Sequence, residues 1–192
     1  MKIILASASP RRRELLSKVF DDFKIMVSDT DENLDDSVHP RDGVRILSVR
    51  KGKAVYDTLS EEEKNEALII SSDTLVEIFD KPLGKPTSVC DAQNMLRTLS
   101  GKRHNVHTGI ALHYKGEVYA ATATTGVYFR EITDEQIDEY IATGEPMDKA
   151  GSYGIQGIGG KFVTSIDGDY DTVVGFSLRL LKELLKEANV DI

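Results

Sequence analysis

The stretch Ile3–Leu16, with the sequence IILASASPRRRELL, decides how the chain begins to fold. Its apolar run predicts a buried strand, and Ser9 with Pro10 predicts a helix start, with serine as the N-cap and proline as the first helical residue. Three arginines follow in the first helical turn, where unpaired N–H groups already carry partial positive charge. This unfavourable placement favours a functional explanation over a solvated basic turn, and we predict an anion site there.

The composition limits the classes of protein to consider. The chain has 192 residues, of which 40% are hydrophobic and 29% are charged, and its net charge is −8. We expect one domain, or two lobes that share a core, without a membrane span or a signal peptide. The single cysteine, Cys90, excludes an internal disulfide and favours a cytoplasmic location. The negative charge argues against nucleic-acid binding, so a local basic cluster must hold any anionic ligand.

The hydrophobic pattern predicts a series of strands and helices. Helices are expected from Arg11 to about Phe20, from Pro40 to about Leu59, after caps at Ser88 and Thr133, and at the leucine-rich C-terminus. Strands are expected over 3–5, 23–27, 67–70, 75–79, 104–113, 117–130 and 162–166, with a further strand ending at Val174. Turns are expected at 80–82 and at 115–116, and the second turn predicts a hairpin.

Lys51 has an unusual position in the helix expected from Pro40. Successive helix residues diverge by about 100°, which places Lys51 in the middle of an apolar stripe, between Leu47 and Val55. A buried lysine needs an anionic partner or a lowered pKa. A lysine that faces a ligand and a lysine that reaches the rim of the stripe are therefore equal alternatives.

Charged residues at the ends of the expected elements indicate phosphate chemistry. Asp73 interrupts two hydrophobic β segments, which packing alone explains poorly. Together with Glu32 and Asp148 it could hold a divalent ion or act as a base, although the acidic run around Glu32 is also typical of a solvated loop. The cations that could hold phosphates are Arg11, Arg12, Arg13, Lys51, Lys85 and Lys149. The pattern fits metal-assisted attack of water on a phosphate ester or anhydride.

Several other motifs are absent from the sequence. The glycine-rich segment 154–161 does not have the spacing of a Walker phosphate loop. Four histidines and one cysteine form no zinc signature, and His104 and His107 are interpreted as ordinary strand residues. The sequence also lacks the Gly-x-Ser-x-Gly elbow that is typical of acyl transfer.

The motifs of the chain and their order resemble those of the Maf family of nucleoside triphosphate pyrophosphatases. The motifs that carry the resemblance are Ser7–Arg12, Ser72–Thr74, Gly84–Pro86, Leu96–Gly101 and Glu145–Gly157. They span nearly the whole chain, and the last of them, EPMDKAGSYGIQG, is highly specific. Two departures are small: Gly52 and Ser152 stand where the family often has alanine.

The resemblance implies a fold and a reaction. The fold is α/β and similar to inosine triphosphatase: one domain over residues 1–192, with an elongated mixed β-sheet, flanking helices, two lobes and a central cleft. The reaction converts a nucleoside triphosphate and water into the monophosphate and pyrophosphate, with a divalent metal, Mg²⁺ or Mn²⁺. The family has also been linked to septum formation.

The resemblance also implies roles for particular residues. Asp73 matches the position of the proton acceptor and, with Glu32, the metal contacts. The positions that match substrate contacts are Ser9, Arg11, Arg12, Lys51, Thr74, Lys85, Asp148, Lys149 and Gln156. Among them, Arg11, Thr74 and Gln156 match the base-specificity positions. They follow the branch that acts on dTTP and UTP, whereas the 7-methyl-GTP branch has Trp, Gln and Glu there.

Gln156 suits a pyrimidine on chemical grounds as well. A carboxamide offers a donor and an acceptor, which match a ring carbonyl and the N3–H of uracil or thymine. A glutamate would only accept, which suits the donor-rich edge of guanine. The alternative is a loop glutamine that bonds to the backbone.

Three hypotheses remain at this point. The first is a house-cleaning hydrolase that removes pyrimidine triphosphates or their modified forms. The second is a non-catalytic nucleotide sensor that acts on cell division through a partner, and the third is a 7-methyl-GTP hydrolase. Asp73 with Glu32 and Lys85 favours an enzyme, because a sensor needs no base. We expect a nucleotide substrate and neither a nucleic-acid nor a membrane partner, and a homodimer is left open.

Overall fold

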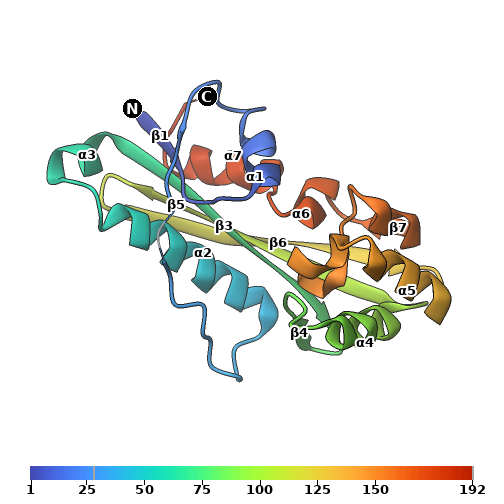
Figure 1. Cartoon of the computed structure of the whole chain (residues 1–192). Helices are drawn as coiled ribbons and strands as arrows, with labels where there is room; N and C mark the ends of the chain where they lie inside the picture. The colour runs from blue at the N-terminus through green and yellow to red at the C-terminus, as the bar shows by residue number, and fades with distance from the viewer. Residues whose placement is uncertain (28, 192) are drawn as a thin grey trace.

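A long mixed β-sheet forms the centre of the computed structural model, which describes residues 1–27 and 29–191 (Figure 1). The strands assigned within these residues are β1 (Lys2–Leu5), β2 (Lys24–Ile25), β3 (Ala67–Ile78), β4 (Lys81–Leu83), β5 (Arg103–Tyr114), β6 (Glu117–Phe129) and β7 (Val163–Asp167). Their order is β2-β1-β3-β5-β6-β7, and β4 pairs with β3 outside this path. β1 is parallel to β2 and β3, whereas the pairs from β3 to β7 are antiparallel. The expected mixed sheet is confirmed.

Helices flank this sheet, with α2 on one side and α7 on the other (Figure 1). The α-helices are α1 (Pro10–Leu16), α2 (Pro40–Tyr56), α3 (Glu61–Glu66), α4 (Val89–Leu99), α5 (Asp134–Ala142), α6 (Tyr170–Val174) and α7 (Leu178–Glu187). Short 3₁₀ helices are η1 (Glu145–Asp148), η2 (Ala150–Ser152) and η3 (Ile158–Phe162). The backbone of α2 lies close against β5, because a Cβ on Gly109 would collide with the carbonyl group of Val44. Glycine at this position therefore allows the helix to approach the sheet.

Two large hydrophobic cores follow one another along β3. Leu68 and Ile70 belong to the first core, together with the buried leucines of α7. Val76 and Ile78 belong to the second core, with apolar residues of α4 and α5. The segment Ser71–Asp73 between them is buried but polar. A polar middle in a central strand needs polar partners, and these partners form the candidate site described below.

Local capping signals correctly predicted several helix starts. The Ser9 hydroxyl accepts a hydrogen bond from the Arg12 backbone N–H, and Pro10 is the first residue of α1. Thr133 and Gln136 form the expected capping box at the start of α5. The predicted hairpin at 115–116 joins β5 to β6, with Tyr114 opposite Glu117.

Other local predictions were wrong. The strand predicted to end at Val174 is the helix α6, which ends at Gly175 in a left-handed conformation with φ of 113°. The turn predicted at 80–82 lies earlier, because Phe79 and Asp80 have positive φ values of 56° and 59°, and Lys81–Leu83 forms β4. β-branched residues favour strands only when a sheet position is available to them. Here β7 already pairs with the end of β6, and Val174 is buried in the first core.

Candidate active site

Asp73 lies in the middle of β3, the central strand of the candidate site. Its side chain is 10% exposed, and Oδ1 accepts a hydrogen bond of 2.6 Å from Nζ of Lys51 on α2. β3 is paired with β5 at this point, where Asp73 lies opposite Gly109. A carboxylate this deeply buried requires a charged or hydrogen-bonding partner. Lys51 supplies both.

Lys51 joins two carboxylates. Its Nζ lies 2.6 Å from Asp73 Oδ1 and 2.8 Å from Oε1 of Glu32, which is in the loop between β2 and α2. The hydrogen bond and charge of Lys51 lower the pKa of Glu32, even though partial burial acts in the opposite direction. The Lys51 side chain is only 20% exposed, so it does not extend freely into solvent. The structure shows the lysine between two anionic partners, and its contact with a ligand stays a prediction.

Arg12 lies on the face of β3 opposite to Asp73, and hydrogen bonds to protein atoms hold its guanidinium there. Its Nε donates to the carbonyl oxygen of Gly175 at 3.0 Å, and Nη1 donates to the carbonyl oxygen of Ser72 at 2.7 Å. Nη2 donates to Oγ1 of Thr74 at 3.3 Å. Burial lowers the pKa of Arg12, and the nearby charge of Asp73 opposes this effect. The guanidinium therefore ties α1 to β3 and to the end of α6.

Thr74 and Asp73 are adjacent in sequence but face opposite sides of the sheet. Consecutive strand residues alternate between the two faces, so Asp73 faces Lys51 whereas Thr74 faces Arg12. The Thr74 hydroxyl also lies 3.0 Å from the hydroxyl of Thr108 on β5. It is thus part of a buried polar network on the Arg12 side.

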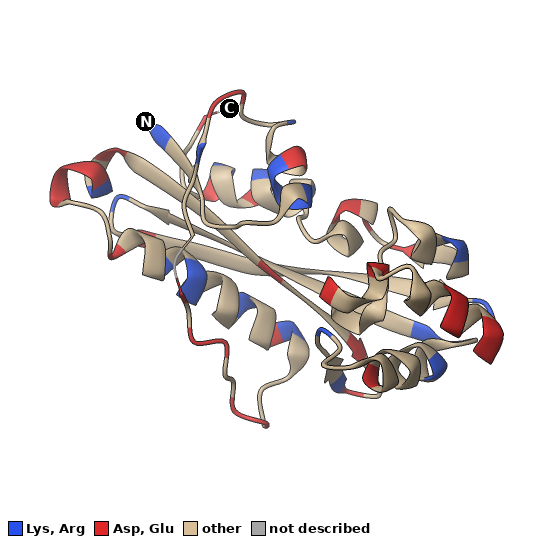
Figure 2. Ribbon diagram, viewed as in Figure 1, with Lys and Arg blue, Asp and Glu red and all other residues tan. Residues whose placement is uncertain are grey.

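Charge interactions link the start of α1 with the 3₁₀ helix η1. Oδ1 of Asp148 lies 2.7 Å from Nζ of Lys149, whose ammonium also donates to the backbone carbonyl of Glu145 at 2.8 Å. The hydrogen bond from Lys149 lowers the pKa of Asp148, and the charge of Arg11 acts in the same direction. The start of α1 and the end of η1 therefore lie within electrostatic range of each other. Figure 2 shows basic segments on α1 and acidic segments along the loop that precedes α2.

The other predicted site residues lie at the surface or in caps. Ser9 is half-buried and serves as the cap of α1. Lys85 is exposed, and its charge contributes to lowering the pKa of Glu32, so these two side chains are in electrostatic range. Gln156 is exposed in a turn, and among the described residues none forms a hydrogen bond with its side chain. The structure therefore joins Lys51, Glu32 and Asp73 and places Lys85 near Glu32, but among the described residues no hydrogen bond connects Gln156 with Asp73.

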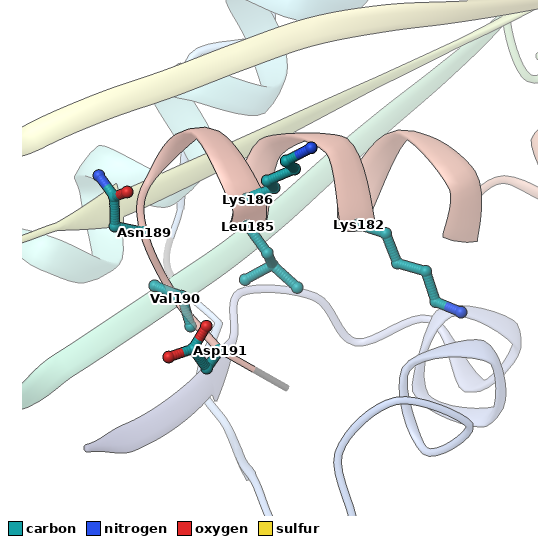
Figure 3. A pocket seen from close by; sticks show the side chains of 6 residues that line it. All are labelled: Lys182, Leu185, Lys186, Asn189, Val190 and Asp191. Atoms are coloured by element: carbon teal, nitrogen blue, oxygen red, sulfur yellow. The ribbon is translucent and has the colours of Figure 1, made fainter.

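Two hollows of about 440 Å³ each lie away from this cluster. The first, at the end of α7, is lined by Lys182, Leu185, Lys186, Asn189, Val190 and Asp191 (Figure 3). The second is lined by His39, Arg41, Glu77, Asp80, Asn105, His107, Thr122, Ala123, Thr124 and Arg179. No predicted site residue lines either hollow.

Sequence reasoning missed several residues that organise the site. The carbonyl oxygen of Gly175 accepts hydrogen bonds from Arg12 and from the Ser72 hydroxyl, which lies 3.1 Å away. The only local signal is a glycine after an apolar run, which is typical of a helix end. The Glu145 side chain holds the loop that carries Gln156, as described below, and no spacing rule identifies such a contact. Outside the site, His107, interpreted as an ordinary strand residue, lies 3.3 Å from Glu77 in a buried pair.

The fold and this site define an α/β protein with a buried lysine–carboxylate centre next to the arginine-rich start of α1. The chain belongs to the Maf family, since the family described as Maf-like protein matches residues 2–188.

Proteins named dTTP/UTP pyrophosphatase are similar to the chain over its whole length. That of Clostridium novyi (strain NT) is 45% identical and covers 100% of both chains. That of Bacillus anthracis is 44% identical and covers 100% of this chain and 97% of its own. Among solved structures, the Ham1 protein of Staphylococcus aureus matches with a TM-score of 0.48 and 14% identity, over 67% of this chain and 72% of that one.

Proposed function

We propose that the chain is a nucleoside triphosphate pyrophosphatase that hydrolyses dTTP and UTP to the monophosphate and pyrophosphate. The observation that carries this proposal is the buried Asp73 carboxylate, held 2.6 Å from Lys51 between two hydrophobic cores. The names of relatives that are 44–45% identical over their full length support the same reaction.

Asp73 is the proposed general base. Its carboxylate accepts a proton from water, whose oxygen attacks the α-phosphorus as the bond from this phosphorus to the oxygen between the α- and β-phosphates breaks, and pyrophosphate leaves with that oxygen. Phosphoryl transfer depends mainly on positioning and on charge stabilisation. Lys51 orients Asp73, the exposed Lys85 supplies positive charge near Glu32, and Arg11 and Lys149 supply positive charge near Asp148.

A divalent ion, Mg²⁺ or Mn²⁺, is part of the proposal. Glu32 and Asp73 would hold it, because their carboxylates already converge on one cation, the Lys51 ammonium. No group of three or more carboxylates, imidazoles or thiols that could hold a metal occurs among residues 1–27 and 29–191. Mg²⁺ is commonly bound by one or two carboxylates together with substrate phosphates and water, and Glu32 and Asp73 would supply the carboxylates. The ion would neutralise phosphate charge.

The proposed base-specificity residues are Arg11, Thr74 and Gln156, and Gln156 would read the base directly. The position of Gln156 supports this assignment, since its exposed carboxamide is free of protein hydrogen bonds in the described part of the chain. Thr74 contributes differently, because its hydroxyl is engaged with Arg12 and Thr108. It therefore fixes the Arg12 side of the site.

The physiological role in this proposal is removal of unwanted pyrimidine triphosphates in the cytoplasm, with a consequence for cell division. Where the structure describes the chain, no helix has the length and apolar character needed to cross a membrane. The net charge of −8 disfavours nucleic acid as a partner. A homodimer stays a prediction.

The decisive experiment measures pyrophosphate release from UTP, dTTP, CTP and GTP, with Mg²⁺ and with Mn²⁺. We expect the highest kcat/KM for UTP and dTTP, no activity after metal chelation, and monophosphate as the product. Release of orthophosphate with a diphosphate product would overturn the proposal, because the wrong anhydride would then be cleaved.

A further inference from the structure

The loop that carries Gln156 is bound by a single carboxylate, that of Glu145. Oε2 of Glu145 accepts a hydrogen bond from the Ile158 N–H at 2.9 Å, and Oε1 accepts one from the Gly159 N–H at 3.0 Å. Oε1 also accepts a bond of 2.7 Å from the Tyr140 hydroxyl. Burial alone would raise the pKa of Glu145, but these donors lower it overall. Hydrogen bonds to a charged acceptor are among the stronger ones in proteins.

Tyr140 extends this attachment to the start of the loop. Its hydroxyl accepts a hydrogen bond of 3.2 Å from the Gly154 N–H, and its ring is fully buried against Phe162 at a centroid distance of 5.2 Å. A Cβ on Gly159 would collide with the Tyr140 hydroxyl oxygen. A Cβ on Gly157 would lie 2.5 Å from Glu145 Oε2. Both glycines therefore allow the backbone to lie directly on the Tyr140–Glu145 pair.

Gln156 lies between the two attached ends of this loop. Because its exposed side chain makes no hydrogen bond within the described residues, its position depends on the backbone that Glu145 and Tyr140 hold. The backbone carbonyl of Glu145 also accepts a hydrogen bond from Lys149, the partner of Asp148. Glu145 thus contacts both the charged segment and the loop that bears Gln156.

We propose that Glu145 is a positioning residue that sets base selectivity by holding Gln156 in place. The inference rests on the proposed function, since it assumes that Gln156 reads the base. The inference requires that loss of the Glu145 carboxylate changes the UTP/CTP ratio of kcat/KM more than it changes kcat. UTP and CTP make the sharpest pair of substrates, because they have similar size and differ at the ring edge that a carboxamide would read.

The experiment compares Glu145→Ala and Glu145→Gln with the matched control Glu139→Gln, which removes an exposed carboxylate from the neighbouring helix α5. In Glu145→Ala we expect faster amide hydrogen exchange at Ile158 and Gly159. The ratio of kcat/KM for UTP to that for CTP should fall about tenfold, mainly through KM, as expected for lost hydrogen bonds. Glu145→Gln keeps one acceptor oxygen and should give a smaller change, and Glu139→Gln should behave as the parent.

A double-mutant cycle with Gln156→Ala tests whether Glu145 acts through Gln156. If it does, Gln156→Ala should change the UTP/CTP ratio much less in the Glu145→Ala background than in the parent. Equal losses for all nucleotides, or fully additive effects, would overturn the inference and leave the proposed function intact. A parent protein that releases no pyrophosphate from UTP or dTTP would instead overturn the proposed function, and the inference with it.

Discussion

The Lys51–Asp73 centre and the Gln156 loop are built in opposite ways. Asp73 lies on the central strand and Lys51 on the helix packed against it, and both side chains are largely buried. Gln156 is exposed in a turn between short 3₁₀ helices, and its backbone is attached through Glu145. Proton transfer requires a constant geometry, which regular elements provide, whereas recognition is commonly carried by loops on a rigid scaffold. The two regions should therefore respond differently to substitution.

The largest effect is expected from Asp73→Asn. Asparagine has nearly the same shape but cannot take a proton from water, and loss of a general base typically lowers the rate by about 10²–10⁴. We expect kcat to fall equally for UTP and dTTP while the fold persists, as checked by circular dichroism and steady-state kinetics. Near-parental kcat in a folded variant would make Asp73 a structural or metal-binding residue only.

Lys51→Met should have the next largest effect. The substitution keeps the apolar stem but leaves Asp73 and Glu32 without their shared cation. Lost hydrogen bonds to charged groups cost about 1.5–3 kcal/mol, so we expect kcat/KM to fall by at least tenfold for all nucleotides alike.

The matched control for this variant is Lys53→Met, which removes an exposed pair with Asp57 and should change little. Unchanged kinetics in Lys51→Met, with higher thermal stability, would show that the lysine has no role in binding or catalysis.

Gln156→Glu tests the Gln156 loop, the second of the two regions compared. Glutamate loses the donor to a ring carbonyl, and a group left unpaired once the bound base covers it typically costs about 1–3 kcal/mol. We expect kcat/KM for UTP and dTTP to fall about tenfold or more, with a smaller change for GTP. A uniform loss across UTP, dTTP, CTP and GTP would mean that Gln156 shapes the loop without reading the base.

A smaller effect is expected on the free energy of unfolding, which should depend on pH through the buried His104. Nε2 of His104 lies 2.9 Å from the hydroxyl of Tyr153, which precedes the Gln156 loop. Burial, with a smaller contribution from the charge of Arg103, lowers the pKa of His104 to about 4. The unfolded chain binds this proton near its ordinary pKa of about 6.5, so folding is favoured above that value. Stability should fall as the pH drops from 6.5 towards 4, by about 2 kcal/mol at pH 5.

Denaturant unfolding at pH 7 and pH 5 measures this difference. In His104→Phe the contribution of His104 is absent, so the loss of stability between these pH values should be smaller than in the parent. Parallel pH dependence of the two proteins would show that His104 is not protonated on unfolding in this range.

The sequence by itself determined the local elements of this protein. The caps at Ser9, Ser88 and Thr133 and the hairpin at 115–116 depend on residues within a few positions of one another, and they formed as predicted. Matching motifs also led from the sequence to the Maf family. Local preference failed at Val173 and Val174, where a strand pattern became α6.

Only the tertiary structure decided which of these residues meet. Arg12 bonds to the carbonyl of Gly175 across 163 positions, and Lys51 reaches Asp73 across 22. The Glu145 carboxylate holds backbone N–H groups up to 14 positions away. The bonds of Arg12 and Glu145 end on backbone atoms, which carry no side-chain identity, and the Lys51–Asp73 bond joins two separate elements, so neither composition nor spacing indicates where such bonds form. They follow from how the sheet and helices pack, because packing decides which buried polar groups must satisfy one another.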